Sequence, residues 1–261
     1  MNSRFSTPLD IKLMNASAWA LYALFAIAAL GIVAAWAMQT SIFAIKKITV
    51  IGEVSHTSMT TLRAYVTPRL RGGFLTMDLA QAREIFESVP WVRRAVVQRE
   101  FPNRLTVQLQ EHQTVAFWGA DGESRLLNDH GEVFEANTGE LEHYELPRLI
   151  GPQGQGAKVL QSYRSLEPLF ADTDLILDRL ELTARGSWLA RLNTGAVLQL
   201  GRGTPAEVVA RTQRFVSTLT QVTSKYGRKL EALESADLRH ESGYAIRIRG
   251  VTTIETLQKK K

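Results

Sequence analysis

The chain has 261 residues, enough for a membrane anchor and one or two domains of roughly 100 residues each. Hydrophobic residues make up 45% and charged residues 22%, as in folded proteins, and the net charge of +5 is small for a dedicated nucleic-acid binder. The absence of cysteine excludes a disulfide framework, a thiol nucleophile and a thiolate metal site.

The first element is predicted to be a membrane-spanning helix. No residue between Lys12 and Lys46 is charged, and this stretch exceeds the about 20 apolar residues that cross a bilayer. We expect a cytoplasmic tail over residues 1–17, a transmembrane helix over residues 18–40 and the bulk of the chain on the far side of the membrane. A cleaved signal peptide is the alternative, because an A-x-A site ends at Ala37, but the apolar stretch is longer than the usual h-region of about 7–15 residues.

The next elements predict a small first domain over residues 41–112. The alternating "ITVIG" indicates a strand, and two helical patterns follow with Ser58 and Asp78 as N-caps. "RRAVVQRE" and "LTVQLQE" then alternate as two strands around the turn "FPNR". The order is strand, helix, helix, strand, strand. Two helices cover one face of so small a sheet, so the other face and one edge are expected to stay open to water or to a partner.

Basic residues are concentrated on this predicted hairpin, namely Arg93, Arg94, Arg99 and Arg104. A nucleic-acid ribbon would need a continuous basic face with interleaved exposed aromatic rings. Acidic neighbours dilute the positive charge here, so a solvated strand face is the preferred interpretation.

A second domain is expected over residues 113–250, and a basic, disordered tail over residues 251–261. Short strands broken by glycine turns lead to a helix in "AKVLQSYRSLEPLF" and a hairpin at Asn193–Gly195. The clearest soluble helix starts at Thr204, with Glu207 completing a capping box and Val222 on its buried face. The predicted class is α+β: one membrane helix, a β-α-α-β-β domain, then a mostly antiparallel β domain with a C-terminal helix and terminal edge strands.

No local motif indicates catalysis, a metal or a cofactor. The five histidines form no H-E-x-x-H pair, and no serine lies in G-x-S-x-G. "LGRGTPA" matches a dinucleotide-binding loop in Gly201, Gly203 and Ala206, but we expect no parallel β-α-β unit around it. A capped strand-to-helix turn is the preferred interpretation, with Arg202 as a minor anion contact.

Four segments in this order resemble the FtsQ/DivIB family of bacterial cell-division proteins: "PWVRRAVVQREFPNRLTVQLQEHQTVAFW", "LLNDHGEVF", "VLQLGRG" and "LRHESGYAIRI". The resemblance implies a POTRA domain followed by a β domain, with no enzymatic activity and no cofactor. It implies a single-pass inner-membrane protein with a cytoplasmic N-terminus and periplasmic domains at the division septum. It also implies a divisome scaffold that connects FtsB and FtsL to septal peptidoglycan synthesis.

The resemblance further implies that FtsB adds a strand to the terminal strand of the β domain. Arg185, shortly before Trp188, matches a family position that pairs with an acidic partner residue. His240 stands where relatives carry tyrosine, and Tyr244 is the alternative aromatic contact. The implied contact positions are Arg185, Arg239, His240, Glu241, Ser242, Gly243 and Tyr244. Without the resemblance, the last six residues read as an ordinary closing strand with a Ser-Gly turn.

Three other function classes remain open from the sequence. A POTRA-containing envelope secretion or assembly component would usually precede an outer-membrane barrel, and no sufficient run of amphipathic strands follows Glu111. An anchored envelope enzyme would need a dispersed site, because no nucleophile, base and orienting group occur together in a local motif. An anchored DNA-binding protein would require the large domains to be cytoplasmic.

Overall fold

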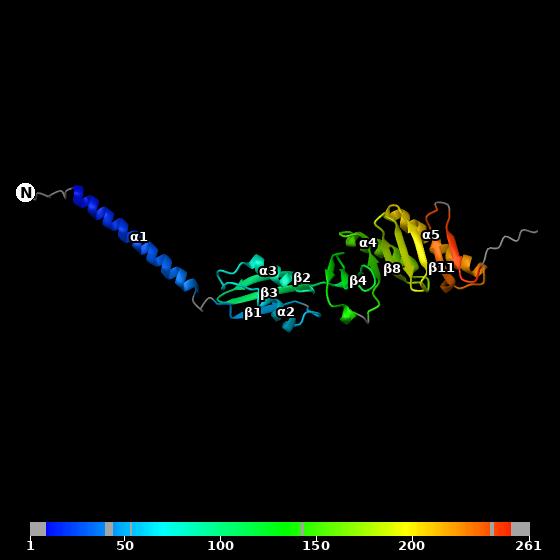
Figure 1. Ribbon diagram of the computed structural model, residues 1–261, viewed down its shortest axis with the longest axis horizontal. Coiled ribbons are helices and arrows are strands. Elements are labelled where there is room, and N and C mark those ends of the chain that lie inside the picture. Colours follow the sequence, from blue (N-terminus) through cyan, green and yellow to red (C-terminus); the bar gives the residue numbers. More distant parts are fainter. Residues whose placement is uncertain (1–8, 40–43, 53, 142–143, 241–242, 252–261) are drawn as a thin grey trace, which may run out of the picture. The chain divides into compact units, whose positions relative to one another are not determined.

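The computed structural model describes residues 9–39, 44–52, 54–141, 144–240 and 243–251. The chain divides into two compact units, Met1–Glu111 and His112–Lys261 (Figure 1). The predicted α+β class, with one N-terminal apolar helix and a mostly antiparallel larger sheet, is confirmed. Glu241 and Ser242, together with nearly all of the predicted basic tail, lie outside the described residues.

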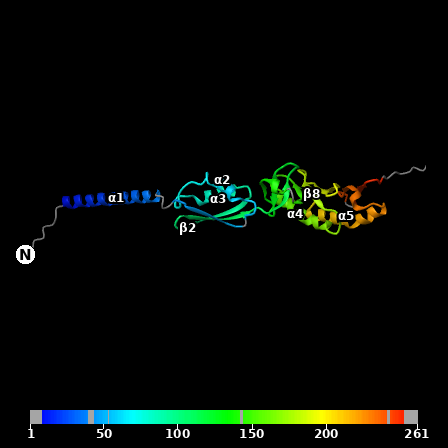
Figure 2. The same ribbon diagram turned by 90° about the horizontal axis from the view of Figure 1, so that it is seen from below.

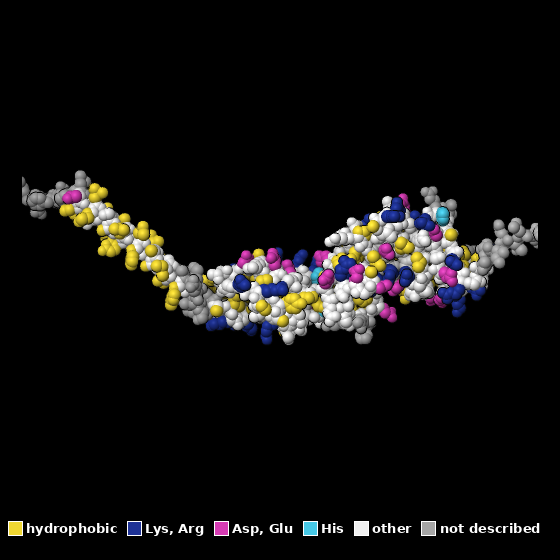
Figure 3. Space-filling model, in the orientation of Figure 1, with side chains coloured by type: hydrophobic (Ala, Val, Ile, Leu, Met, Phe, Trp, Pro, Cys, Tyr) yellow, Lys and Arg dark blue, Asp and Glu magenta, His cyan; other side chains and the backbone are white. Residues whose placement is uncertain are grey.

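The apolar helix α1 (Leu9–Gln39) contains a 24-residue segment, Asp10–Val33, that could cross a membrane by its length and composition. Figure 3 shows hydrophobic side chains along its visible face. The helix begins at Leu9, within the stretch assigned to a tail, because residues 9–17 contain no glycine or proline. Asp10 lies in the first turn, where a negative carboxylate interacts favourably with the positive end of the helix dipole.

The rest of the first unit has the predicted β-α-α-β-β order. Its elements are β1 (Lys47–Ile51), α2 (Met59–Val66), α3 (Leu79–Glu87), β2 (Val92–Glu100) and β3 (Arg104–Glu111). The strand order is β1-β3-β2, with β1 parallel and β2 antiparallel to β3. Ser58 and Asp78 cap the two helices as predicted, each accepting hydrogen bonds from backbone N–H groups of the first turn.

The core of the first unit lies between the two helices and one face of the sheet. Leu62 and Phe86 from the helices pack with Val107 and Leu109 of β3. Alternation along β3 places these side chains on the helix side and Gln108 in solvent, as the sequence pattern predicts.

Arg99 corrects the prediction that the basic residues of the hairpin are only solvated. Its Nε donates to the carbonyl of Phe74 at 2.7 Å, and its Nη2 donates to the carbonyl of Met77. Arg94 and Arg104 are exposed as expected. The guanidinium of Arg99 thus supports the loop before α3, because its planar group reaches two carbonyls at once.

The second unit is built on a nine-stranded sheet with the order β12-β11-β10-β9-β8-β7-β4-β5-β6. Its strands are β4 (Thr114–Trp118), β5 (Arg125–Asn128), β6 (Val133–Glu135), β7 (Arg148–Ile150), β8 (Leu177–Leu182), β9 (Trp188–Leu192), β10 (Val197–Gly201), β11 (Leu233–Asp237) and β12 (Ala245–Ile248). Five neighbouring pairs are antiparallel. The pairs β4–β7, β7–β8 and β10–β11 are parallel.

Two helices, α4 (Gly156–Leu166) and α5 (Pro205–Lys225), pack against this sheet and against each other. Figure 2 shows them along the same side of the strands. The predicted capping box of Thr204 and Glu207 is present. At the other end of α5 the buried residue is Thr223 rather than the predicted Val222, which is half-buried, because the step of four from Leu219 keeps Thr223 on the inner face. Short 3-10 turns complete the unit at Thr138–Leu141, Glu167–Phe170 and Leu230–Ala232.

The prediction that no parallel β-α-β unit surrounds "LGRGTPA" is wrong. β10 and β11 are parallel neighbours joined through α5, because this long helix returns the chain to the end of the sheet where β10 starts. The position in this turn where an anion would bind is nevertheless filled by the carboxylate of Glu207. The Thr204 N–H donates to Glu207 Oε2 at 2.8 Å, and a Cβ built on Gly203 would lie 2.4 Å from that oxygen. A negative group thus occupies the place where a phosphate would bind.

Candidate partner-binding site

The outer edge of β12 is one of the two open strand edges of the second unit. Within the described residues β12 pairs only with β11, so the backbone groups on its other side face no strand. Ala245 and Arg247 are exposed, while Ile248 is buried in the core. The opposite edge, β6, is one residue shorter. An open edge of this kind can accept an added strand.

The implied contact positions lie mainly in the connection before this strand rather than on it. β11 ends at Asp237 and β12 begins at Ala245, so Arg239, His240, Gly243 and Tyr244 belong to the connection. The family resemblance assigned these residues to the terminal strand as one segment, "LRHESGYAIRI", although residues 239–243 contain no apolar residue and do not alternate. A partner strand paired with β12 would therefore contact these side chains only near the first residue of β12, Ala245.

Arg239 is held by a two-point ion pair with Asp237. Its Nε donates to Oδ1 at 2.9 Å and its Nη2 donates to Oδ2 at 2.6 Å, and its backbone N–H also donates to Oδ1. These hydrogen bonds from Arg239 lower the pKa of Asp237 to about 2, and the same pair raises the pKa of Arg239. The Arg239 side chain remains 57% exposed, so a fixed positive group is presented to solvent.

Tyr244 and His240 have different environments. The hydroxyl of Tyr244 lies 2.6 Å from Thr218 Oγ1, and its ring meets Phe215 edge-on with centroids 5.1 Å apart. Tyr244 is half-buried and packs the connection against α5, whereas His240 is exposed. Of the two aromatic residues, His240 is the one whose ring is open to a partner.

Arg185 lies at the same end of the sheet as these residues. It is exposed in the turn between β8 and β9, and Trp188 at the start of β9 pairs with Gly201 at the end of β10. β10 and β11 run parallel, so the end of β11 and the connection share this end. Neighbouring strands are about 4.8 Å apart, so two to three strand spacings, about 10–15 Å, separate Arg185 from the connection.

The structure adds basic residues that sequence reasoning did not assign to the site. A Cβ built on Gly201 would lie 3.0 Å from Arg239 Cγ and 3.4 Å from Arg211 Nη1, so both side chains cover this glycine. Arg211 donates to the carbonyl of Arg202, and Arg211, Arg214, His240 and Tyr244 line a hollow of about 10 Å³. We call Arg202, Arg211, Arg214 and Arg239 the cationic end. The sequence did contain one indication of this cluster: Arg211 and Arg214 are three residues apart, which places both on one face of a helix.

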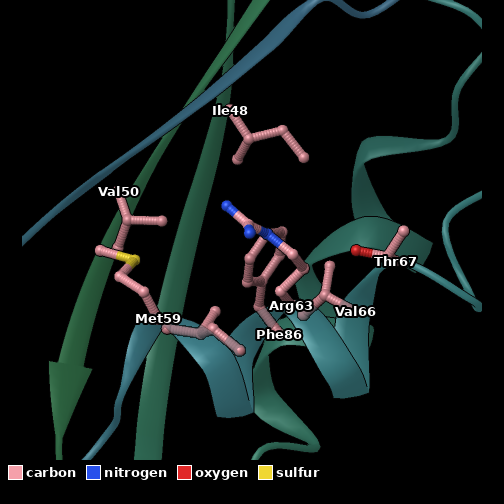
Figure 4. A pocket seen from close by; sticks show the side chains of 8 residues that line it. Ile48, Val50, Met59, Arg63, Val66, Thr67 and Phe86 are labelled. Carbon is pink, nitrogen blue, oxygen red and sulfur yellow. The ribbon is translucent and has the colours of Figure 1, made fainter.

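The first unit has an open strand edge as well. In the described part of the chain β1 pairs with β3 alone, and a groove of about 250 Å³ lies between β1 and α2. Figure 4 shows Arg63 extending from α2 into the space between the helix and Ile48, with Met59 and Phe86 beside it. The groove is mainly apolar and has one positive group.

In comparison with known proteins, each of the two units matches a known domain family. The model of the "POTRA domain, FtsQ-type" family matches residues 43–112, and that of "Cell division protein FtsQ/DivIB, C-terminal" matches residues 116–239. The chain is 39% identical to Cell division protein FtsQ of Thiomonas arsenitoxydans, over 94% of this chain and 89% of the relative. It is 36% identical to the protein of the same name in Burkholderia pseudomallei, over 97% and 98% of the two chains.

These matches confirm the resemblance inferred from the four sequence segments, and they cover nearly the whole chain. The first unit contains the POTRA domain that this resemblance implied, and the second contains the β domain. The chain therefore belongs to the FtsQ/DivIB family of bacterial cell-division proteins.

Proposed function

We propose that this protein is a non-enzymatic scaffold of the divisome that binds FtsB and FtsL through its second unit. In this proposal α1 anchors the chain in the inner membrane, with the N-terminus in the cytoplasm and both soluble domains in the periplasm at the septum. The single observation that carries the proposal is the open outer edge of β12 beside the cationic end. Family membership supports a role in cell division.

The two features of this site supply different parts of recognition. Main-chain N–H and C=O groups on the outer side of β12 can pair with an extended segment, which gives affinity with little dependence on sequence. The guanidinium of Arg239 is already oriented by Asp237, so it loses little freedom on meeting a carboxylate. A partner segment with acidic residues at one end fits this arrangement.

The absence of cysteine allows a direct test of strand addition. A single cysteine replaces exposed Ala245 on β12, and single cysteines are scanned along the C-terminal periplasmic segment of FtsB from the same organism. A disulfide forms only when the two Cα atoms approach to about 4.4–6.8 Å, and diagonal neighbours across a strand pair lie about 7–8 Å apart. A paired strand therefore gives a cross-link mainly at the one partner position opposite residue 245. The matched control is Glu135→Cys, which is exposed on β6 at the other edge of the same sheet.

The full chain in lipid nanodiscs is used, first with the FtsB segment and then with FtsB and FtsL together. A cross-link confined to one partner position at Ala245→Cys, with none at Glu135→Cys, supports the proposal. Equal cross-linking at both edges, or none at Ala245→Cys even with FtsL present, contradicts strand addition at β12. Loss of binding in Arg202→Glu would assign the cationic end to the interface.

A further inference from the structure

The turn between β2 and β3 carries an unusually exposed aromatic side chain. Phe101 is 78% exposed, more than any other large hydrophobic residue in the described part of the chain, including Trp19 of α1 at 76%. Leu75, in the loop before α3, is 47% exposed. We call Phe101 and Leu75 the apolar tip.

The apolar tip is supported from below rather than free. The rings of Phe101 and buried Phe74 meet edge-on, with centroids 6.3 Å apart. Arg99, two residues before Phe101, holds the carbonyl of Phe74. The Thr76 hydroxyl closes the same loop by accepting from the Gly73 N–H at 2.9 Å. Contacts between the turn and the loop therefore present Phe101 and Leu75 at one end of the sheet.

Positive groups surround this end of the sheet. Lys47 pairs with Arg104 across β1 and β3, directly beside the turn, and both are exposed, as is Lys46. Glu100 lies here too, and its carboxylate accepts from the Thr106 hydroxyl at 3.0 Å. Three cations thus face one carboxylate, which favours an anionic partner.

The chain itself ties the apolar tip to the end of the membrane helix. The Lys46 N–H donates to the carbonyl of Asn103 in the turn at 3.0 Å. Lys46 follows the last residue of α1, Gln39, by only seven positions. An extended chain spans at most about 3.6 Å per residue, so this link reaches no further than about 25 Å. The residue bonded to the turn that carries Phe101 therefore stays within this distance of the end of α1.

We propose that the apolar tip is a membrane contact: Phe101 and Leu75 enter the headgroup region, and Lys46, Lys47 and Arg104 bind the phosphates of anionic phospholipids. An exposed aromatic ring with flanking cations is suited to this boundary, where apolar area and charge attraction act together. The contact would fix how the first unit stands on the membrane. It rests on α1 being the anchor, which is part of the proposed function.

The test uses the full chain in nanodiscs and an environment-sensitive fluorophore on a single cysteine. Leu75→Cys is the reporter because it leaves Phe101 in place, and Gln110→Cys, exposed near the far end of β3, is the matched control. Nanodiscs contain phosphatidylglycerol with phosphatidylethanolamine, or phosphatidylcholine alone, each with nitroxide-labelled lipid as quencher. Leu24→Cys within α1 reports insertion of the anchor separately.

We expect blue-shifted emission and quenching at Leu75→Cys in the anionic nanodiscs, and neither at Gln110→Cys. Both signals should be lost when Phe101→Ser is added, a change at an exposed position that should leave the fold intact, as circular dichroism would check. Water-like emission at Leu75→Cys while Leu24→Cys is quenched overturns the proposal but not the anchor. Equal quenching in phosphatidylcholine overturns the anionic part of the proposal. An unquenched Leu24→Cys overturns the anchor, and this proposal with it.

Discussion

Glu111, the last residue of β3, is predicted to hold the first unit together through a single carboxylate. Its Oε2 accepts from the N–H groups of Ser55 at 2.8 Å and His56 at 3.1 Å, and its Oε1 accepts from Thr57 at 2.8 Å. The Glu111 side chain is only 7% exposed. Replacing it with glutamine removes the charge and turns an N–H₂ group toward backbone donors, so one or more of these bonds is lost.

The expected loss follows from the number of bonds and their exposure. A hydrogen bond to a charged group contributes about 1.5–3 kcal/mol, and the contributions of three bonds that share one carboxylate do not add fully. Ser55 is exposed and regains water, whereas Thr57 is buried and does not. We expect Glu111→Gln to lower the free energy of unfolding of the first unit by about 2–3 kcal/mol.

Hydrogen–deuterium exchange of the full chain measures this loss for each unit separately. Amides of β3 that exchange through unfolding of the first unit should exchange roughly 30- to 150-fold faster in Glu111→Gln, because about 1.4 kcal/mol corresponds to a factor of ten. The control is Glu100→Gln, since that exposed carboxylate accepts one hydroxyl. Equal exchange rates in the two variants would refute the reasoning.

The pH dependence of this stability difference provides an independent test of the role of Glu111. Burial alone would raise the pKa of Glu111, but the donors at Thr57, His56 and Ser55 lower it below the ordinary value of 4.5. A lowered pKa in the folded state means that the contribution is complete above about pH 4.5 and is lost as the pH falls through the folded value. The difference between wild type and Glu111→Gln should therefore shrink below about pH 4.5.

Two further predictions concern the second unit. The bonds from Arg239 lower the pKa of Asp237 to about 2, so Asp237→Asn should destabilise this unit at pH 7, and thermal unfolding should show the difference fading as the pH falls from about 4 to about 2. Gly131→Ala should destabilise it by more than about 1 kcal/mol, because the new Cβ would lie 2.3 Å from Ala157 Cα. Gly122→Ala shares the positive φ but meets open space, so equal midpoints in urea for the two alanine variants would contradict this.

Features that depend on neighbouring residues could be predicted from the sequence. The apolar run of α1, the order of the five elements in the first unit, the caps at Ser58 and Asp78 and the capping box of α5 all follow patterns within a few residues. These patterns work because helix periodicity, strand alternation and capping bonds are local. The family resemblance was likewise carried by short segments.

Features that depend on strand order could not be predicted in this way. The parallel pairing of β10 with β11, the position of β12 at the edge and the convergence of Arg185, Arg202 and Arg239 at one end of the sheet come from hydrogen bonds between distant segments. A strand pattern shows which face is buried but does not identify the neighbouring strand. The role of Arg99 was missed for the same reason, since its carbonyl partners lie 25 and 22 residues away.

The sequence by itself determined the long apolar helix α1, the fold class and the family of this protein, because each depends on local pattern or on the similarity of short segments. Only the tertiary structure decided which strand edge is open and which cations stand beside it. It also decided that the exposed Phe101 turn is hydrogen-bonded to the segment that follows α1. Those arrangements depend on register and packing between residues far apart in the chain, where no local preference acts.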